Sequence, residues 1–129
     1  MTTYNQLLKR RLVCKKRYKG RMFNKPQIRG RVLKVLVMSP RKPNSARRKT
    51  CQVLLSTRKK VFAKIIGEGS IPNKYASVLI RGGGYRDTPQ VNYTIIRGVL
   101  ECLSIFRKSR RRSFFGVKKY IYGVNDKYE

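Results

Sequence analysis

Five short apolar or alternating segments restrict what this chain can fold into more than any other feature. They cover residues 32–38, 50–55, 61–65, 77–80 and 93–96. Glycines at 67, 69 and 82–84 interrupt the intervals between them. Segments of this length, with turn residues between them, are typical of β-strands. No stretch of the chain predicts a helix longer than two or three turns.

Five short strands joined by turns favour a small closed or half-closed barrel, for which the five-stranded OB-fold is the natural candidate. Because 40% of the 129 residues are apolar, one core of about 70–90 residues is feasible. We expect a mainly β protein with an OB-type barrel in residues 31–106. An amino-terminal arm (1–30) precedes it, a basic tail (107–129) follows it, and no second domain is expected.

The arm combines a short helix with an extended basic segment. Thr3 and Gln6 have the spacing of a capping box, and Leu7 and Leu8 add a little apolar surface. Eleven of residues 9–31 are Lys or Arg, so this segment buries too little apolar area to offset its ordering entropy alone. We expect it to become ordered only against a partner.

The charge balance indicates what that partner is. The chain has 33 Lys and Arg against five Asp and Glu, a net charge of +28, so it repels itself unless a polyanion neutralises it. No run approaches the roughly 20 apolar residues of a membrane-spanning helix. The cations are also not gathered on one helical face, as membrane-surface binding would require. Nucleic acid is therefore favoured over a membrane or an acidic protein, with strongly salt-dependent binding.

Groups for catalysis or metal binding are scarce. The three cysteines (Cys14, Cys51 and Cys102) are widely spaced and histidine is absent, so a zinc site would lack ligands. We expect reduced, partly buried thiols, with a disulfide as the alternative. Without histidine, acid–base and nucleophilic catalysis lack their usual base. We predict a protein that is not an enzyme and uses no metal or cofactor.

The basic turn at residues 40–49 is the most informative motif. Its uncharged tip is Pro43-Asn44-Ser45-Ala46. Pro and Asn favour a turn, and the tip offers an amide and a hydroxyl, whereas the flanking cations only donate to anions. We expect the flanks to hold phosphates and the tip to contact finer features of the nucleic acid. The flanking cations are Arg41, Lys42, Arg47, Arg48 and Lys49.

A second loop, Arg81–Asp87, is rich in glycine but lacks the Gly-Lys-Ser/Thr of a nucleotide-phosphate loop. It is either a flexible strand connection or a place where backbone approaches RNA while Arg86 contacts a phosphate. We expect Asp87 to orient Arg86 or to cap the turn. The tail cations are either solvated or bound to phosphates without base specificity. They are Arg107, Lys108, Arg110, Arg111 and Arg112.

Several motifs occur in one order along the chain. They are Lys42-Pro43-Asn44-Ser45-Ala46 with Arg48-Lys49, Gly67-Glu68-Gly69, Leu79-Ile80-Arg81-Gly82-Gly83, Asp87 with Pro89, Val91 and Tyr93, Arg97-Gly98, and Arg112-Ser113 with Gly116-Val117-Lys118. Asn5-Gln6-Leu7 and Pro26-Gln27 with Arg29-Gly30 precede them. Together they resemble the bacterial-type small-subunit ribosomal protein S-twelve family, from about residue 3 to residue 119.

The resemblance implies an OB-type barrel with a long amino-terminal extension at the decoding centre of the small ribosomal subunit. Its implied partners are small-subunit rRNA, neighbouring ribosomal proteins and the nearby codon–anticodon helix of mRNA and tRNA, and its implied role is translational accuracy and tRNA selection. The implied decoding-loop residues are Lys42, Pro43, Asn44, Ser45, Arg86, Asp87, Thr88 and Pro89. The expected basic rRNA contacts are Arg41, Arg47, Arg48, Lys49, Arg81, Arg107, Lys108, Arg110, Arg111 and Arg112.

The chain also departs from that family. The family usually has Lys where Arg86 stands, its His-rich stretch is replaced by residues 70–75, and the tail from Tyr120 differs. This divergence favours an organelle-encoded copy, in the mitochondrial matrix rather than a plastid, with an AT-rich bacterium as a further alternative. A free single-stranded RNA-binding OB-fold protein, such as an RNA chaperone, is the alternative function. A basic membrane-active or secreted polypeptide is a third alternative function. It is disfavoured because the sequence contains no concentrated amphipathic helix.

Overall fold

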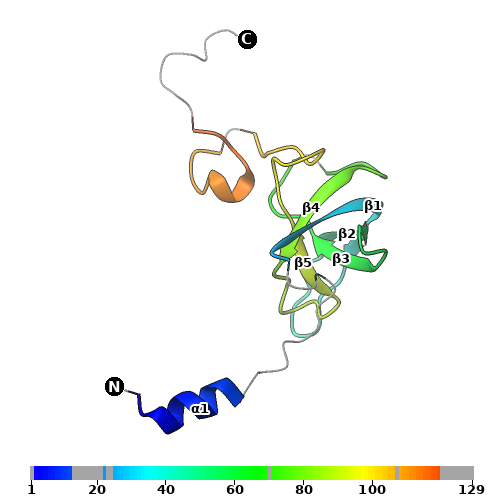
Figure 1. Ribbon diagram of the computed structural model, residues 1–129. Coiled ribbons are helices and arrows are strands. Elements are labelled where there is room, and N and C mark those ends of the chain that lie inside the picture. The colour runs from blue at the N-terminus through cyan, green and yellow to red at the C-terminus, as the bar shows by residue number, and fades with distance from the viewer. Residues whose placement is uncertain (1, 13–21, 23–24, 70, 107, 120–129) are drawn as a thin grey trace.

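A computed structural model of the protein describes residues 2–12, 22, 25–69, 71–106 and 108–119. Figure 1 shows the strands arranged around one core, with a short carboxy-terminal helical turn outside it. The elements are α1 (Tyr4–Leu12), β1 (Gln27–Met38), β2 (Arg48–Leu55), β3 (Lys60–Lys64), β4 (Ser77–Gly82), β5 (Val91–Ile95) and the 3-10 helix η1 (Ser113–Phe115).

The strands form one closed barrel in the order β1-β2-β3-β5-β4. Neighbouring strands are antiparallel except β3 and β5, which run parallel. β1 closes the barrel, because residues 27–31 pair with β4 and residues 30–38 pair with β2, with Gly30 and Arg31 paired on both sides. A register shift between Val32 and Lys34 interrupts the pairing of β1 with β2, as a bulge does when a strand bends. The predicted mainly β, five-stranded barrel of OB type is confirmed.

β1 begins at Gln27, five residues before the strand expected at 32–38. Residues 27–31 pair with β4, so the expectation that they are ordered only by a partner is wrong. This part of the strand was missed because the surrounding cations concealed its alternation of buried and exposed side chains. Ile28 faces the core, whereas Arg29 and Arg31 are exposed. Gly30 allows close contact, because a Cβ there would lie 2.5 Å from a methyl carbon of Val53.

Other strand boundaries differ from the predictions by one or two residues. β2 begins at Arg48, where it pairs with Met38, instead of at residue 50. β4 continues to Gly82, and β5 covers 91–95 instead of 93–96. β3 ends one residue early, at Lys64. In each case backbone pairing with a neighbouring strand, which local residue preference does not reveal, decides where the strand ends.

The interior of the barrel is filled by β-branched side chains that alternate with outward-facing polar ones. Val53, Val78, Ile80 and Ile95 are completely buried, and Val61 is 2% exposed. Burying a side chain of this size stabilises the fold by about 1.5–3 kcal/mol. The core is therefore small but continuous around the barrel, which fixes the positions of the loops at its ends.

The predicted capping box begins α1. The backbone N–H of Thr3 donates to Oε1 of Gln6 at 3.1 Å, and the N–H of Gln6 donates to Oγ1 of Thr3 at 3.4 Å. Leu7 and Leu8 are 48% and 43% exposed. The basic stretch at 13–21 lies outside the described residues. No helix in the described parts of the chain combines the length and the apolar character needed to cross a bilayer.

Cys51 and Cys102 are free and buried, as expected, whereas Cys14 lies outside the described residues. Burial raises the pKa of the Cys51 thiol from 9.0 to about 12, and the nearby Cys102 adds to this effect. Burial also raises the pKa of Cys102, and Arg97 opposes that rise. Both thiols are therefore held protonated as apolar core groups.

Replacing Ile80 with Ala should lower the free energy of unfolding by about 2–5 kcal/mol, because it leaves a cavity in the barrel. Val37→Ala is the matched control, since Val37 is 61% exposed on β1, and it should change stability by no more than about 0.5 kcal/mol. Urea unfolding followed by circular dichroism measures both. Equal losses for the two variants would show that the core does not lie where the structure places it.

Cys51 should react slowly with iodoacetamide at pH 8 in the folded chain and quickly in urea, because the thiolate is the nucleophile. Since the folded-state pKa is raised from 9.0 to about 12, burial of this thiol stabilises the fold below pH 9. That contribution declines as the pH rises from 9 toward 12. Peptide mass spectrometry gives the labelling rate, and a rate unchanged by urea would contradict burial.

Candidate RNA interface

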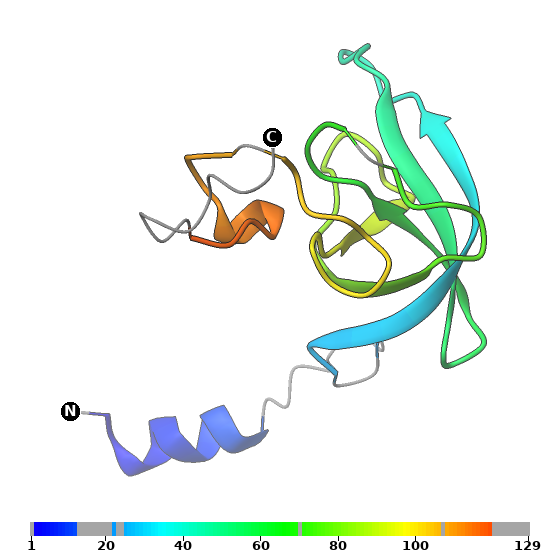
Figure 2. The same cartoon turned by 90° about the horizontal axis from the view of Figure 1, so that it is seen from above.

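Two loops that are far apart in the sequence meet at one end of the barrel. The tip between β1 and β2 projects beyond the barrel body (Figure 2), and the β4–β5 loop lies against its base. The backbone N–H of Arg41 donates to the carbonyl oxygen of Asp87 at 2.8 Å, which joins the two loops. The N–H of Asn44 donates to the carbonyl of Arg41 at 3.0 Å and closes the turn.

The tip presents its polar groups outward. Lys42, Asn44 and Ser45 are exposed, as is Pro43, which follows a cis peptide bond. Among the flanking cations, Arg41, Arg47 and Lys49 are also exposed. The structure therefore places amide, hydroxyl and cationic groups on a single projecting surface, where an RNA backbone and base edges can reach them.

Asp87 pairs with Arg48 and not with Arg86, so the expectation that it orients Arg86 is wrong. Oδ2 of Asp87 lies 3.0 Å from Nη2 of Arg48, with the carboxylate side chain 13% exposed. The hydroxyl of Thr88 donates to the other carboxylate oxygen at 3.4 Å. Closure of the barrel brings β2 beside this loop. Because Arg48 and Asp87 are 39 residues apart in the sequence, their pairing could not be seen in it. Arg86 is left exposed.

Tyr85 and Lys64 support this arrangement, although the sequence analysis did not identify them. The Tyr85 ring lies 5.1 Å from Cζ of Arg48 and 4.7 Å from Nζ of Lys64, within the range of cation–π attraction. Nζ of Lys64 also donates to the carbonyl of Gly84 at 3.3 Å. The position of Tyr85 between glycines and a cation was the signal available in the sequence.

The β4–β5 loop is closed by its own backbone. The N–H of Tyr85 donates to the carbonyl of Val91 at 3.2 Å, and the N–H of Val91 donates to that of Thr88 at 3.0 Å. Thr88 is 3% exposed, whereas Pro89 is exposed. A side chain at Gly84 would overlap the Val91 carbonyl, since a Cβ would lie 1.8 Å from that oxygen. The loop therefore presents Arg86 and Pro89 from a fixed backbone.

The basic residues near η1 form a second cluster, which includes Arg81 at the end of β4. Cζ of Arg81 and of Arg111 lie 5.9 Å and 5.0 Å from the centre of the Phe114 ring. Nζ of Lys108 lies 3.0 Å from Oε1 of Glu68, and this hydrogen bond lowers the pKa of that carboxyl. Arg110 is exposed and Arg112 is half-buried. Arg107 lies outside the described residues.

A buried arginine, which the sequence analysis listed as part of a motif without predicting its role, connects the barrel to its carboxy-terminal segment. Arg97 is 2% exposed. Its Nε donates to the Ile66 carbonyl at 2.9 Å, Nη1 to that of Leu103 at 3.3 Å, and Nη2 to that of Glu68 at 3.5 Å. Its hydrogen bonds satisfy a buried charge that would otherwise be costly. The signal in the sequence was a lone cation within an apolar run.

The described residues include no group of three or more Cys, Asp or Glu side chains positioned to hold a metal ion. The side chains at this end of the barrel donate hydrogen bonds and carry positive charge, and those at the tip also accept hydrogen bonds. Such groups bind phosphates and base edges.

Comparison with known proteins identifies the family. The family model described as Ribosomal protein S12/S23 matches residues 15–119. The chain belongs to this family. Small ribosomal subunit protein uS12c of Toxoplasma gondii is 40% identical over 121 residues, covering 94% of this chain and 100% of that protein. The resemblance inferred from the motifs is confirmed.

Two further relatives carry the mitochondrial form of the name. Small ribosomal subunit protein uS12m of Paramecium tetraurelia is 40% identical over 118 residues, covering 92% of this chain and 85% of that protein. The uS12m protein of Bigelowiella natans is 42% identical over 105 residues, covering 81% and 83%. Plastid (uS12c) and mitochondrial (uS12m) forms are both similar to this chain, which supports an organellar ribosome.

Replacing Asp87 with Asn should lower the free energy of unfolding by about 1.5–3 kcal/mol, because the charged hydrogen bond to Arg48 is lost. In a double-mutant cycle with Arg48→Gln, the two changes should be coupled by about 1 kcal/mol. Arg86→Gln is the control, and its effect should stay within about 0.5 kcal/mol. Additive effects of the Asp87 and Arg48 substitutions would show that the pair does not join the loops.

Proposed function

We propose that this protein is a non-enzymatic constituent of an organellar small ribosomal subunit that binds small-subunit rRNA at the decoding centre and influences translational accuracy and tRNA selection. Membership of the ribosomal protein S12/S23 family supports the ribosomal assignment. The decoding assignment depends on one structural observation, which is the backbone hydrogen bond between Arg41 and Asp87. This bond joins two exposed loops of complementary chemistry.

The side chains of the two loops determine what each loop can bind. Lys42 and Arg86 are exposed cations at the two loops, and each can bind phosphate oxygens. Asn44 and Ser45 can donate to and accept from RNA groups that inspect the codon–anticodon helix. Arg86 has a planar guanidinium that binds phosphate through two parallel hydrogen bonds, which a lysine cannot do. The polar groups of the tip then form hydrogen bonds that depend on RNA geometry, while the cations hold the RNA in place.

Rigid placement is the contribution of the barrel. The Arg48–Asp87 pair and the Tyr85 contacts fix both loops relative to the buried core. A small displacement of RNA at the tip is therefore resisted, and the loops shift the balance between alternative rRNA conformations during decoding. In this proposal the arm before β1 and the basic tail contact rRNA and neighbouring ribosomal proteins, and mRNA and tRNA lie nearby.

We assign the ribosome to the mitochondrial matrix, with the plastid as the alternative. The divergence at residues 70–75 and at Arg86 supports an organelle-encoded copy, and uS12m proteins of two organisms are 40% and 42% identical to this chain. Fractionation of organelles followed by mass spectrometry of their small subunits distinguishes the two compartments. Peptides of this chain should be recovered from mitochondrial subunits.

Lys42→Ala and Arg86→Ala should each change the misreading rate several-fold, because both remove an exposed cation at the decoding loops. A reporter that requires misreading of one codon measures the error rate in subunits that carry each variant. Lys59→Ala is the control, since Lys59 is an exposed cation in the β2–β3 turn. It should leave the error rate unchanged.

Assembly provides the opposing outcome. Sucrose-gradient sedimentation should show that the Lys42 and Arg86 variants enter small subunits normally. Loss of assembly with unchanged error rates would contradict the decoding role. A chain that remains free of subunits in high-salt extract would favour the alternative of a free single-stranded RNA-binding protein.

A further inference from the structure

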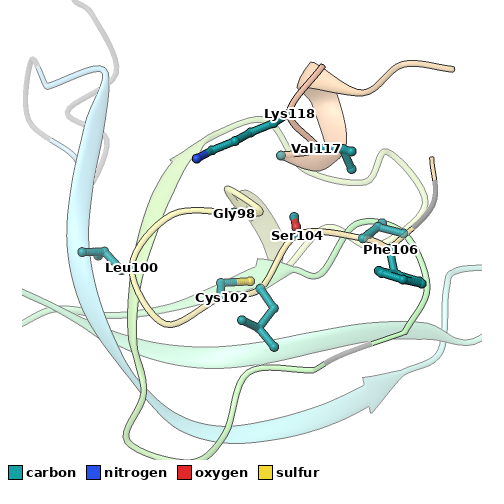
Figure 3. A pocket seen from close by; sticks show the side chains of 10 residues that line it. Gly98, Leu100, Cys102, Ser104, Phe106, Val117 and Lys118 are labelled. Carbon is teal, nitrogen blue, oxygen red and sulfur yellow. The ribbon is translucent and has the colours of Figure 1, made fainter. Parts of the chain in front are cut away.

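A cleft of about 380 Å³ lies beside the barrel, lined by residues between Gly98 and Lys118. Figure 3 shows that residues 98–106 form one side and residues 116–118 the other. This volume falls within the range of about 300–1,000 Å³ that is usual for sites of small organic groups. One wall of the cleft, Gly116 to Lys118, belongs to the carboxy-terminal segment that the sequence analysis treated only as a basic tail.

The walls of the cleft are held by contacts that leave little freedom. Gly98 and Gly116 touch, because a Cβ on Gly98 would lie 2.8 Å from the Gly116 carbonyl oxygen. The N–H of Ile105 donates to the Phe115 carbonyl at 3.3 Å, which ties the two sides together. The buried Arg97 holds the Leu103 carbonyl. The cleft is therefore a preformed part of the fold.

The groups along the cleft differ from end to end. In Figure 3 the aromatic ring of Phe106 lies at one end and the amino group of Lys118 at the other, with Ser104 between them. Phe106 is 78% exposed, and Lys118 and Ser104 are also exposed. Cys102, which is 1% exposed, also contributes to the lining. No acidic residue is among the lining residues.

We propose that this cleft binds one unpaired nucleotide of ribosomal RNA. The base stacks on Phe106, the phosphate pairs with Lys118, and the Ser104 hydroxyl hydrogen-bonds the base edge or the ribose. Single-stranded RNA is commonly recognised by stacking splayed bases on aromatic side chains, and a lysine binds phosphate as a point charge. The inference rests on the proposed assembly into a small ribosomal subunit and adds a second recognition site to it.

Charge favours a nucleotide over a protein segment as the occupant. The rim carries Lys118, with Lys119 next to it, and the whole chain carries +28. A basic protein segment would be repelled, and a neutral apolar side chain would leave Lys118 without an anion. A nucleotide supplies a flat apolar ring and a negative charge in one ligand, which matches the two ends of the cleft.

Ultraviolet crosslinking of purified small subunits, followed by mass spectrometry of peptide–nucleotide adducts, tests the site directly. Peptides that contain residues 104–106 or 116–118 should carry a covalently attached nucleotide. Adducts between these peptides and another protein, or no adducts, would overturn the inference. Absence of the whole chain from the subunits would instead overturn the proposed function, so the two failures are distinguishable.

Variants at Phe106 provide a second readout that does not depend on crosslinking. Chemical probing of rRNA in subunits should show a nucleotide that is protected by the natural chain and by Phe106→Tyr. In subunits with Phe106→Leu its reactivity should rise at least about 5-fold, since stacking on an aromatic ring contributes about 5- to 150-fold in affinity. Lys118→Met should also raise the reactivity, whereas Lys119→Met should not.

Protection that persists in Phe106→Leu subunits would overturn the site. So would equal loss of protection in Phe106→Leu and Phe106→Tyr, because that pattern indicates packing against a protein instead of stacking on a base. Sedimentation of each variant subunit confirms that assembly is intact before the probing result is interpreted.

Discussion

Mutual repulsion among 33 Lys and Arg side chains, against five acids, is the constraint on which the rest of the structure depends. The chain gathers its buried apolar side chains into one barrel interior, where Val53, Val78, Ile80 and Ile95 are fully buried. Most of the described cations are exposed, whereas Arg97 is buried and donates to backbone carbonyls. A core of this size stabilises a small domain only modestly, so the surface charge requires a polyanion, and we propose that ribosomal RNA is that polyanion.

The barrel turns this general attraction into a specific one by fixing where polar groups point. The Arg41–Asp87 backbone bond and the Arg48–Asp87 ion pair join the two loops at one end. Arg97 fastens the segment that carries the cleft beside the barrel. Phosphate contacts alone position a protein on RNA without reading it. In the proposed function, the loops and the cleft are the sites at which this basic chain reads RNA.

The sequence predicted the barrel because inward positions alternate with polar ones in most strands, and it predicted the capping box from Thr3 and Gln6. It missed the start of β1, because the outward arginines of residues 27–31 hid the buried Ile28. It also assigned the wrong partner to Asp87, since the pairing with Arg48 exists only once the barrel closes. The cleft could not be predicted, because its two sides, 98–106 and 116–118, meet only through tertiary contacts.

The salt dependence of binding tests most directly whether RNA phosphates neutralise this chain. The measurement is the affinity of the full chain for small-subunit ribosomal RNA between about 50 and 200 mM monovalent salt. Release of counterions from 6–10 phosphates would lower the affinity by about 10³–10⁵ over this range, linearly in the logarithm of salt concentration. An affinity that does not change with salt would contradict neutralisation by RNA as the force that holds this protein in its working state.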